Sequence, residues 1–271
     1  MPELPEVETT ARGIAPHVLD KTITGVTIRD SRLRWPVPND LSSHVVGHAI
    51  IKVWRRAKYI LLDVGAGSVI IHLGMSGSLR VLPASEPARP HDHVELRLQD
   101  DDCLRLHDPR RFGCVLWADG DGLQHQRLVS LGVEPLSDEF DAEHLYRLSR
   151  GRKTAIKNFI MDGRIVVGVG NIYASEALFL SGIHPLRAAG RISLQRYERL
   201  CDCIKRTLQD AIKSGGTTLR DYYNSAGEPG YFALSLNTYG REDDPCHQCG
   251  ATIRRKIIGQ RSTFYCPRCQ R

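Results

Sequence analysis

The first residues of the chain place a possible amine nucleophile beside a carboxylate. If Met1 is removed, as expected because the next residue is small, Pro2 exposes a secondary amine and Glu3 follows it. A terminal amine titrates at about pH 8, so part of it is neutral and nucleophilic at physiological pH. A neighbouring carboxylate can move protons during a covalent reaction. The pair indicates nucleophilic catalysis.

Four cysteines near the other end form a candidate metal site. They lie in CHQC at 246–249 and CPRC at 266–269, with sixteen residues between the pairs. Four thiolates complete a tetrahedral zinc site that leaves no open coordination position, whereas the alternatives are free cysteines or a redox dithiol. The spacing favours one structural Zn²⁺, bound by Cys246, Cys249, Cys266 and Cys269.

Basic residues accompany two segments that could contact a phosphate backbone. Residues 251–271 contain six basic and no acidic residues. Earlier, VVGVGNIY places Gly168 and Gly170 before Asn171. A dinucleotide-binding motif is rejected because Tyr173 occupies the position of its third glycine. A turn whose backbone N–H groups hold a phosphate fits better, although a plain helix connection is the alternative. The nearby basic residues favour nucleic acid: Arg150, Arg152, Lys153 and Lys157.

Further candidates have both an ordinary and a functional interpretation. Arg110 and Phe112 in HDPRRFG could push between bases, or belong to a plain turn. Met75 in HLGMSG is a core residue or a wedge. Lys58 in RRAKY begins an apolar strand and is a surface lysine or a proton donor. His91 in HDH lacks further ligands nearby, so a structural or phosphate-contacting role is favoured over a metal.

The surrounding pattern predicts the elements that would position these residues. Helical periodicity covers 5–18, where Pro16 is expected to end the helix early, and strand-like alternation covers 22–118 with a loop at 83–90. The glycine-rich segment 214–232 reads as a mobile loop. Further helices are predicted at 141–149, 154–162, 171–181 and 193–213. The last carries an apolar stripe that is expected to be core, formed by Tyr197, Leu200, Cys201, Ile204, Leu208 and Ala211.

Composition narrows the class of protein. The 271-residue chain has 41% hydrophobic residues and a net charge of +6, which favours a polyanionic partner. It shows no targeting segment and no run of 18 apolar residues. We therefore expect a protein of a bacterial-type cytoplasm or nucleoid, without a membrane span.

The motifs together resemble those of bacterial formamidopyrimidine-DNA glycosylases, also called 8-oxoguanine DNA glycosylases, over essentially the whole length. In order they are MPELPEVET, RRAKY, IHLGMSGSLR, HDH, DPRRFG, TAIK, VVGVGNIYASE, GIHP, GGTTLRD, PGYF, YGR and QRSTFYC. The resemblance implies a bifunctional glycosylase and AP lyase that flips an oxidised purine out of duplex DNA.

The resemblance also implies roles for single residues. Pro2 resembles the Schiff-base nucleophile, Glu3 its acid–base partner and Lys58 the general acid of β-elimination. Arg261 resembles the zinc-finger arginine linked to δ-elimination and phosphate contact, and Asn171 the phosphate-holding residue of a helix–two-turn–helix motif. The loop around 217–223 resembles one that closes over the damaged base. The remaining matches are DNA-contacting or gap-filling positions: Met75, His91, Arg110, Phe112 and Arg152.

We therefore predict an α+β fold with four parts. These are an N-terminal β-sandwich with flanking helices at 1–130, a linker at 131–150, a helical domain at 151–240 and a zinc-finger hairpin at 241–271. A monomer that binds damaged double-stranded DNA is expected. Two alternatives stay open: an endonuclease VIII-type glycosylase for oxidised pyrimidines, and a non-catalytic zinc-ribbon DNA-binding protein.

Overall fold

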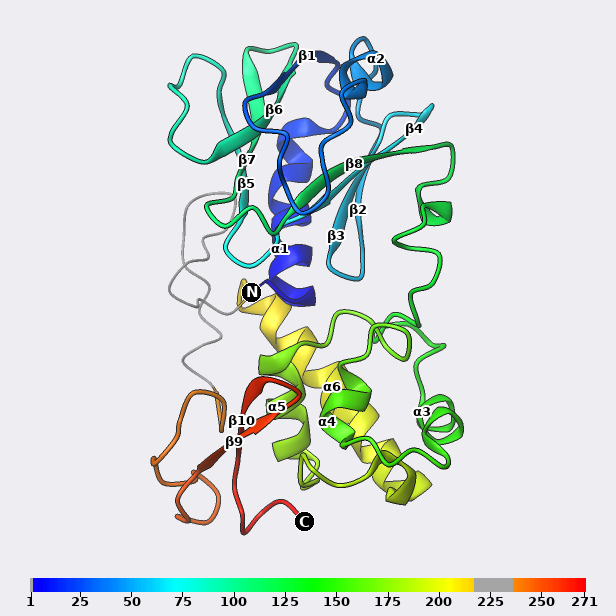
Figure 1. The fold of residues 1–271 in the computed structure, drawn as a ribbon, viewed down its shortest axis with the longest axis vertical. Helices are drawn as coiled ribbons and strands as arrows, with labels where there is room; N and C mark the ends of the chain where they lie inside the picture. Colours follow the sequence, from blue (N-terminus) through cyan, green and yellow to red (C-terminus); the bar gives the residue numbers. More distant parts are fainter. Residues whose placement is uncertain (1, 217–235) are drawn as a thin grey trace. The chain divides into compact units, whose positions relative to one another are not determined.

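The computed structural model describes residues 2–216 and 236–271, and the chain divides into two compact units (Figure 1). The first comprises Met1–Ser130 and Ser214–Ala233, and the second Leu131–Lys213 and Leu234–Arg271. The four-part division made from the sequence stays a prediction. Most of the predicted loop at 214–232 lies outside the described residues. Within the described part, no helix is both long and apolar enough to cross a membrane.

Two antiparallel four-stranded sheets form the first unit. Their strand orders are β1-β6-β7-β5 and β2-β3-β4-β8, and one apolar core takes residues from both sheets and from helix α1 (Figure 1). This confirms the predicted sandwich. The strands are β1 Ile23–Ile28, β2 Lys52–Arg56, β3 Tyr59–Asp63, β4 Gly67–His72, β5 Ser78–Pro83, β6 Asp92–Leu98, β7 Asp102–His107 and β8 Cys114–Asp119.

The alternating pattern of β6 hides a second buried face. Val94, Leu96 and Leu98 enter the core as the alternation predicts. Glu95, which lies between them in the chain, is nevertheless only 2% exposed. Its carboxylate pairs with Arg105 on β7 and with Arg29, at 2.9 Å in each case. At Glu95 the polar face of this strand is therefore covered by an ion-pair network rather than by water, whereas Arg97 on the same face is exposed.

Helix α1, Leu4–Val18, runs between the two sheets and packs on β2, β3 and β5 (Figure 1). Pro5 occupies its first turn, where the missing N–H is not needed. The predicted helix at 5–18 is confirmed to its last residue, and Pro16 does not end it early. A short helix that the strand-like pattern did not reveal, α2, spans Leu41–Val45, and a 3₁₀ turn spans Gly122–Gln124.

Helices dominate the second unit. The long helix α6 buries its predicted stripe, and α3 and α5 pack against it. The predicted helix at 154–162 is shorter, because Ala155 is extended and Met161 caps the turn. The segment predicted as a linker contains α3. The helices are α3 Ala142–Ser149, α4 Ile156–Ile160, α5 Asn171–Leu180 and α6 Leu194–Lys213, with a 3₁₀ turn at Ala189–Arg191.

A two-stranded hairpin completes this unit. β9, Arg254–Ile258, pairs antiparallel with β10, Arg261–Tyr265. The connecting residues Gly259 and Gln260 both have positive φ, at +55° and +61°. A two-residue hairpin loop requires this backbone geometry to match the twist of its strands. The hairpin leads directly into the second cysteine pair, so its register sets where those thiols lie.

Candidate functional site

The N-terminal segment holds Pro2 and Glu3 in the interior of the first unit. Both are buried, and Glu3 is 2% exposed. The Glu3 backbone N–H donates to Glu6 Oε2 at 2.8 Å, and the Glu3 side chain accepts from the Glu6 backbone N–H. This capping box fixes the Glu3 carboxyl group at the positive end of the α1 dipole. A buried carboxyl group is therefore held on the residue that follows Pro2, whose nitrogen becomes an amine once Met1 is removed.

Gly216 brings the chain back to this segment just before residues 217–235. Its φ is +87°, and a Cβ there would lie 3.3 Å from Glu6 Cγ and Oε1. Glycine suits both the backbone conformation and the close approach. The predicted lesion-closing loop at 217–223 follows this contact but lies outside the described residues.

Lys58, predicted at the start of a strand, lies in the tight turn that precedes β3. Ala57 in this turn has φ +54°. Arg55 supports the turn by donating to the Ala57 carbonyl at 2.9 Å and pairs with Glu8 on α1 at 2.8 Å. Burial raises the pKa of Glu8, but the hydrogen bonds and charges of Arg55 and Arg12 lower it overall. The ion pair links the turn that carries Lys58 to the helix that follows Glu3.

His72, at the end of β4, is a residue near Lys58 that the sequence interpretation did not single out. Burial, with the positive charges of Lys58 and Arg34, lowers the pKa of His72 to about 4. The Gly74 backbone N–H donates to His72 Nδ1 at 2.9 Å, so the neutral ring carries its proton on Nε2. The signal was present in IHLGM, where a histidine ends a buried strand beside a glycine.

Three predicted wedge residues lie on two turns of the first unit. Met75 is 38% exposed in the turn between β4 and β5. Phe112 is 43% exposed in the turn between β7 and β8, and the Arg110 guanidinium lies 5.0 Å from its ring centre. Large apolar side chains in such exposed positions suit contact with another molecule. The pairing of a cation with an aromatic ring suits the edge of a base stack.

His91 is exposed in the turn before β6 and has φ +73°. Its ring centre lies 6.1 Å from those of His93 and His107. His93 Nε2 lies 2.9 Å from the Asp108 carbonyl oxygen, and His107 Nδ1 lies 2.9 Å from Asp92 Oδ1. His93 and His107 are therefore hydrogen-bonded within the protein, whereas the His91 side chain faces solvent.

Asn171 begins α5 after the glycine turn, where Gly168 has φ +77°. Its side chain is fixed rather than free: Oδ1 accepts from Lys157 Nζ at 2.5 Å, and Nδ2 donates to the Ser262 carbonyl at 3.0 Å. Lys157 is fully buried and also donates to Thr263 Oγ1 at 2.6 Å. The structure therefore joins the helix pair to the hairpin through Lys157. Lys157 was one of the basic residues taken to favour nucleic acid, and its burial shows that it supports the fold instead.

Arg152 and Arg261 are exposed in the second unit. Arg152 Nε donates to the Leu148 carbonyl at 2.8 Å, and its guanidinium lies 5.8 Å from the Phe159 ring centre. Arg261 starts β10 opposite Ile258, directly after the hairpin turn. Both positions present a cation to solvent, Arg152 from the connection between α3 and α4 and Arg261 from the start of β10. Arg150, in contrast, is held against Tyr146 and the Ile192 carbonyl.

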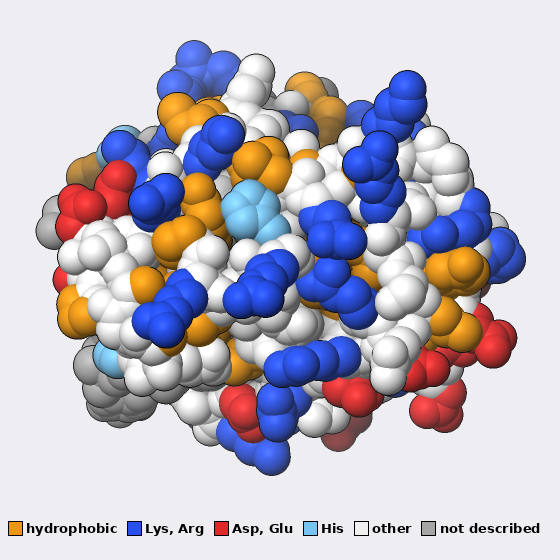
Figure 2. Space-filling model, turned by 90° about the horizontal axis from the view of Figure 1, so that it is seen from below, with side chains coloured by type: hydrophobic (Ala, Val, Ile, Leu, Met, Phe, Trp, Pro, Cys, Tyr) orange, Lys and Arg blue, Asp and Glu red, His pale blue; other side chains and the backbone are white. Residues whose placement is uncertain are grey.

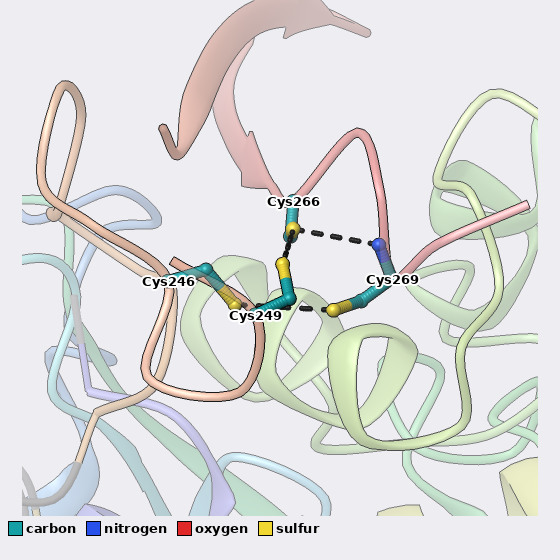
Figure 3. A group of neighbouring side chains, drawn as sticks. All are labelled: Cys246, Cys249, Cys266 and Cys269. Carbon is teal, nitrogen blue, oxygen red and sulfur yellow. Dashed lines mark hydrogen bonds between the residues drawn. The ribbon is translucent and has the colours of Figure 1, made fainter. Parts of the chain in front are cut away.

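The four predicted zinc ligands converge at the base of the hairpin (Figure 3). All four Sγ atoms lie within 4.8 Å of one another, with Cys249–Cys266 at 3.5 Å and Cys246–Cys269 at 3.9 Å. Tetrahedral Zn–S bonds of about 2.3 Å place the sulfurs roughly 3.8 Å apart, so the set fits one Zn²⁺. Within residues 2–216 and 236–271, no other cluster of three or more His, Cys, Asp or Glu is placed to hold a metal.

The surroundings of the cluster act differently on its thiols, because burial raises the pKa of Cys266 and Cys269 while Cys249 is shifted the other way. A hydrogen bond from the Ala251 backbone lowers the pKa of Cys249 to about 7. Cys246, Cys266 and Ile253 pack with Phe179 of α5 in a small apolar core. A zinc ion bound by these four ligands would be structural, since the protein fills every coordination position.

Positive charge dominates one face of the molecule. In the view from below, Lys and Arg side chains spread over the surface, while Asp and Glu lie mostly toward its edges (Figure 2). The net charge is +6. Such a face attracts a polyanion and releases its counterions on binding.

Three family models match the chain. They are the formamidopyrimidine-DNA glycosylase N-terminal domain over residues 1–115, the H2TH domain of the same enzymes over 131–223, and the zinc finger found in FPG and IleRS over 243–271. The formamidopyrimidine-DNA glycosylases of Syntrophotalea carbinolica and Methylococcus capsulatus are 57% and 56% identical over 271 residues, covering all of both chains.

Solved structures agree with these matches. The MutM (Fpg) protein of Thermus thermophilus is 36% identical with a TM-score of 0.89, covering 99% of this chain and 98% of that one. Lactococcus lactis Fpg in complex with DNA containing an abasic site is 30% identical with a TM-score of 0.90, covering 99% of each. MutM in complex with DNA containing carbocyclic 8-oxo-G is 30% identical with a TM-score of 0.91, covering 100% of each. The predicted family resemblance and fold class are confirmed.

Proposed function

The chain belongs to the formamidopyrimidine-DNA glycosylase family, and we propose that it excises oxidised purines from duplex DNA as a bifunctional glycosylase and AP lyase of base excision repair. The observation that carries this is the unbroken match to enzymes of that name over the whole chain. The substrates are 8-oxoguanine and formamidopyrimidines, and the strand is then cleaved by β,δ-elimination.

The chemistry begins at Pro2. Its neutral amine attacks the sugar C1′, the damaged base leaves with the bonding electrons, and ring opening yields an iminium between the Pro2 nitrogen and C1′. The iminium withdraws electrons and acidifies the C2′ proton. Loss of that proton expels the 3′ phosphate, and a second elimination expels the 5′ phosphate. Glu3, buried beside Pro2, moves protons during ring opening.

Other residues assist these steps and hold the DNA. Lys58 supplies a proton during β-elimination, and Arg261 contacts phosphate and promotes δ-elimination. Asn171 holds a phosphate at the start of α5. A base inside a duplex cannot be reached, so the nucleotide is flipped out and wedge residues fill the gap. The remaining DNA contacts are made by Met75, His91, Arg110, Phe112 and Arg152.

The protein's setting follows from this activity. It acts as a monomer on double-stranded DNA that contains an oxidised base or an abasic site. The zinc ion is structural and supports DNA contact by the hairpin. We place the protein in the bacterial cytoplasm, associated with the nucleoid.

Borohydride trapping tests this function directly, because it reduces the iminium to a stable protein–DNA adduct. Wild-type protein with a mass that shows Met1 removal should form the adduct on duplex carrying 8-oxoguanine opposite cytosine. Pro2→Gly should largely abolish excision, and Glu3→Gln should lower it roughly 100-fold or more while DNA binding is retained. Glu139→Gln, an exposed carboxylate, is the control and should behave as wild type.

Three outcomes would contradict the proposal. Excision at the wild-type rate by Pro2→Gly would exclude Pro2 as the nucleophile. Faster excision of thymine glycol than of 8-oxoguanine would indicate an endonuclease VIII-type activity. DNA binding without any adduct, from correctly processed protein, would indicate a non-catalytic zinc-ribbon protein.

A further inference from the structure

Two turns of the first unit carry the wedge residues, and each passes from one sheet to the other between paired strands, because β4 pairs with β8 and β5 with β7. Residues 73–77 join β4 to β5 and carry Met75, while residues 108–113 join β7 to β8 and carry Arg110 and Phe112. The side chains of Met75 and Phe112 are well exposed. Packing around these two side chains therefore provides little support, so their positions depend on the backbone of the turns.

Asp108 organises the turn that carries Phe112. It is fully buried, and its Oδ2 accepts from the Gly113 backbone N–H at 2.7 Å, which closes the turn. Its carbonyl accepts from the Arg111 N–H at 3.1 Å and lies 2.9 Å from His93 Nε2. Its own N–H donates to the His91 carbonyl at 3.0 Å. Asp108, the first residue of the turn, thus bonds to the middle and the last residue of the turn, and also to the start of β6 and the residue before it.

The two turns also touch through their backbones. Gly74 has φ +68°, and a Cβ there would lie 2.5 Å from the Gly113 nitrogen and 2.6 Å from the Phe112 carbonyl carbon. A Cβ on Gly113 would lie 2.5 Å from the His72 carbonyl oxygen and 2.9 Å from Asp108 Oδ2. Only glycine permits such an approach, so any shift of one turn is transmitted to the other.

The carboxylate has a feature that packing alone does not explain. Asp108 Oδ1 is buried and accepts no hydrogen bond from the described residues. An unsatisfied buried acceptor destabilises a fold. A side chain needed only for packing would not bury an unpaired oxygen. A carboxylate carries this penalty if its other oxygen must form a strong charge-assisted bond to the Gly113 N–H.

We propose that Asp108 is a positioning residue that holds the Met75 and Phe112 turns together as one rigid wedge. It touches neither DNA nor the reacting atoms and acts through Phe112, Arg110 and Met75. This inference rests on the proposed function, because a wedge matters only if a duplex is opened. Loss of Asp108 should therefore impair work on duplex DNA and spare chemistry that needs no base stack to be opened.

The test compares two substrates for Asp108→Asn, which keeps the size of the side chain and removes its charge. For excision of 8-oxoguanine from duplex, kcat/KM should fall at least tenfold. Cleavage at an abasic site in single-stranded DNA should change less than twofold. Fluorescence of 2-aminopurine opposite the lesion should show slower opening of the stack. Glu95 is another buried carboxylate of this unit. Its substitution, Glu95→Gln, should lower thermal stability without lowering activity more on duplex than on single-stranded DNA.

A double-mutant comparison shows whether Asp108 acts through the wedge. In a Met75→Ala, Phe112→Ala background, Asp108→Asn should cause no further loss on duplex. Gly74→Ala, which changes no charge and pushes the turns apart, should reproduce the duplex-selective loss. This variant tests the same contact if Asp108→Asn does not fold. Equal losses on both substrates, or full additivity with the wedge substitutions, would overturn the proposal. An inactive wild type on duplex would instead contradict the proposed function.

Discussion

At the scale of single residues, His72 shows how the environment sets a side chain's chemistry. Burial, together with the positive charges of Lys58 and Arg34, lowers the pKa of the ring and keeps it neutral, and the hydrogen bond from the Gly74 N–H to Nδ1 leaves its proton on Nε2. A neutral donor beside a cation avoids a second positive charge in the same place. The charge of Lys58 thus acts on His72, although fourteen positions separate them in the chain.

We predict a pH-dependent contribution of His72 to stability. Its folded pKa of about 4 lies below the ordinary value of 6.5, so between these values the unfolded chain binds a proton that the folded protein does not. Stability should therefore fall as pH drops through this window, by roughly 2 kcal/mol at pH ~4.5. His72→Asn, which keeps an acceptor near Nδ1, should lose this part of the pH dependence. Urea unfolding of both proteins at pH ~7 and ~4.5 measures the free energy of unfolding. An equal loss of stability between these pH values in the two proteins would contradict the assignment.

At the scale of elements, α5 organises the second unit through polar side chains on a buried helix. At its first residue, Asn171 contacts the hairpin. Near its middle, Glu176 is 1% exposed and accepts from the backbone N–H groups of Asn237, Thr238 and Tyr239, and from the Asn237 side chain, at 2.8–3.0 Å. This carboxylate fixes the segment that leads into the first cysteine pair.

We predict that Glu176→Gln destabilises the second unit. The amide would turn an N–H₂ group toward backbone donors, so at least one charge-assisted bond is lost and a buried donor is left unpaired. The free energy of unfolding should fall by about 2–4 kcal/mol, and hydrogen exchange at Thr238 and Tyr239 should accelerate. Glu143→Gln, exposed on α3, is the matched control and should change stability by less than about 0.5 kcal/mol. Unchanged exchange at Thr238 would show that Glu176 does not hold the segment.

At the scale of the whole molecule, each unit has apolar packing of its own. The core of the first unit draws on α1 and both sheets. The cysteine cluster packs instead with Phe179, Leu180 and Phe264 in the second unit. The metal site and the Pro2–Glu3 segment therefore depend on separate packing, and each should tolerate loss of the other.

Zinc removal should test this separation. With a strong chelator, or in Cys266→Ser, the hairpin should loosen and the affinity for damaged duplex should fall roughly tenfold or more. The NMR signals of β1–β8 should remain, and adduct formation on single-stranded abasic DNA should persist. Added Zn²⁺ should restore binding to the chelated wild type but not to Cys266→Ser. Loss of the β-sheet signals on chelation would contradict the independence of the two cores.

The sequence alone predicted much of this protein, because the information was local or carried by motifs. CxxC spacing predicted the metal cluster, and strand alternation with turn signals predicted the sandwich. Helical periodicity predicted α6 with its buried stripe, and the ordered motifs from MPELPEVET to QRSTFYC indicated the family. In each case the feature depends on residues a few positions apart, or on a resemblance that spans the chain.

Only the tertiary structure decided which polar side chains meet across long separations. Lys157 was one of the basic residues that favoured nucleic acid, yet it is buried against Asn171 and Thr263, the latter more than a hundred positions away. Glu95 sat on the polar side of an alternating strand and proved to be ion-paired inside. Nothing local reports such partners, because a buried charge is stabilised by whatever the fold brings to it. The contact of Gly74 with Gly113 likewise exists only once β4, β7 and β8 have assembled.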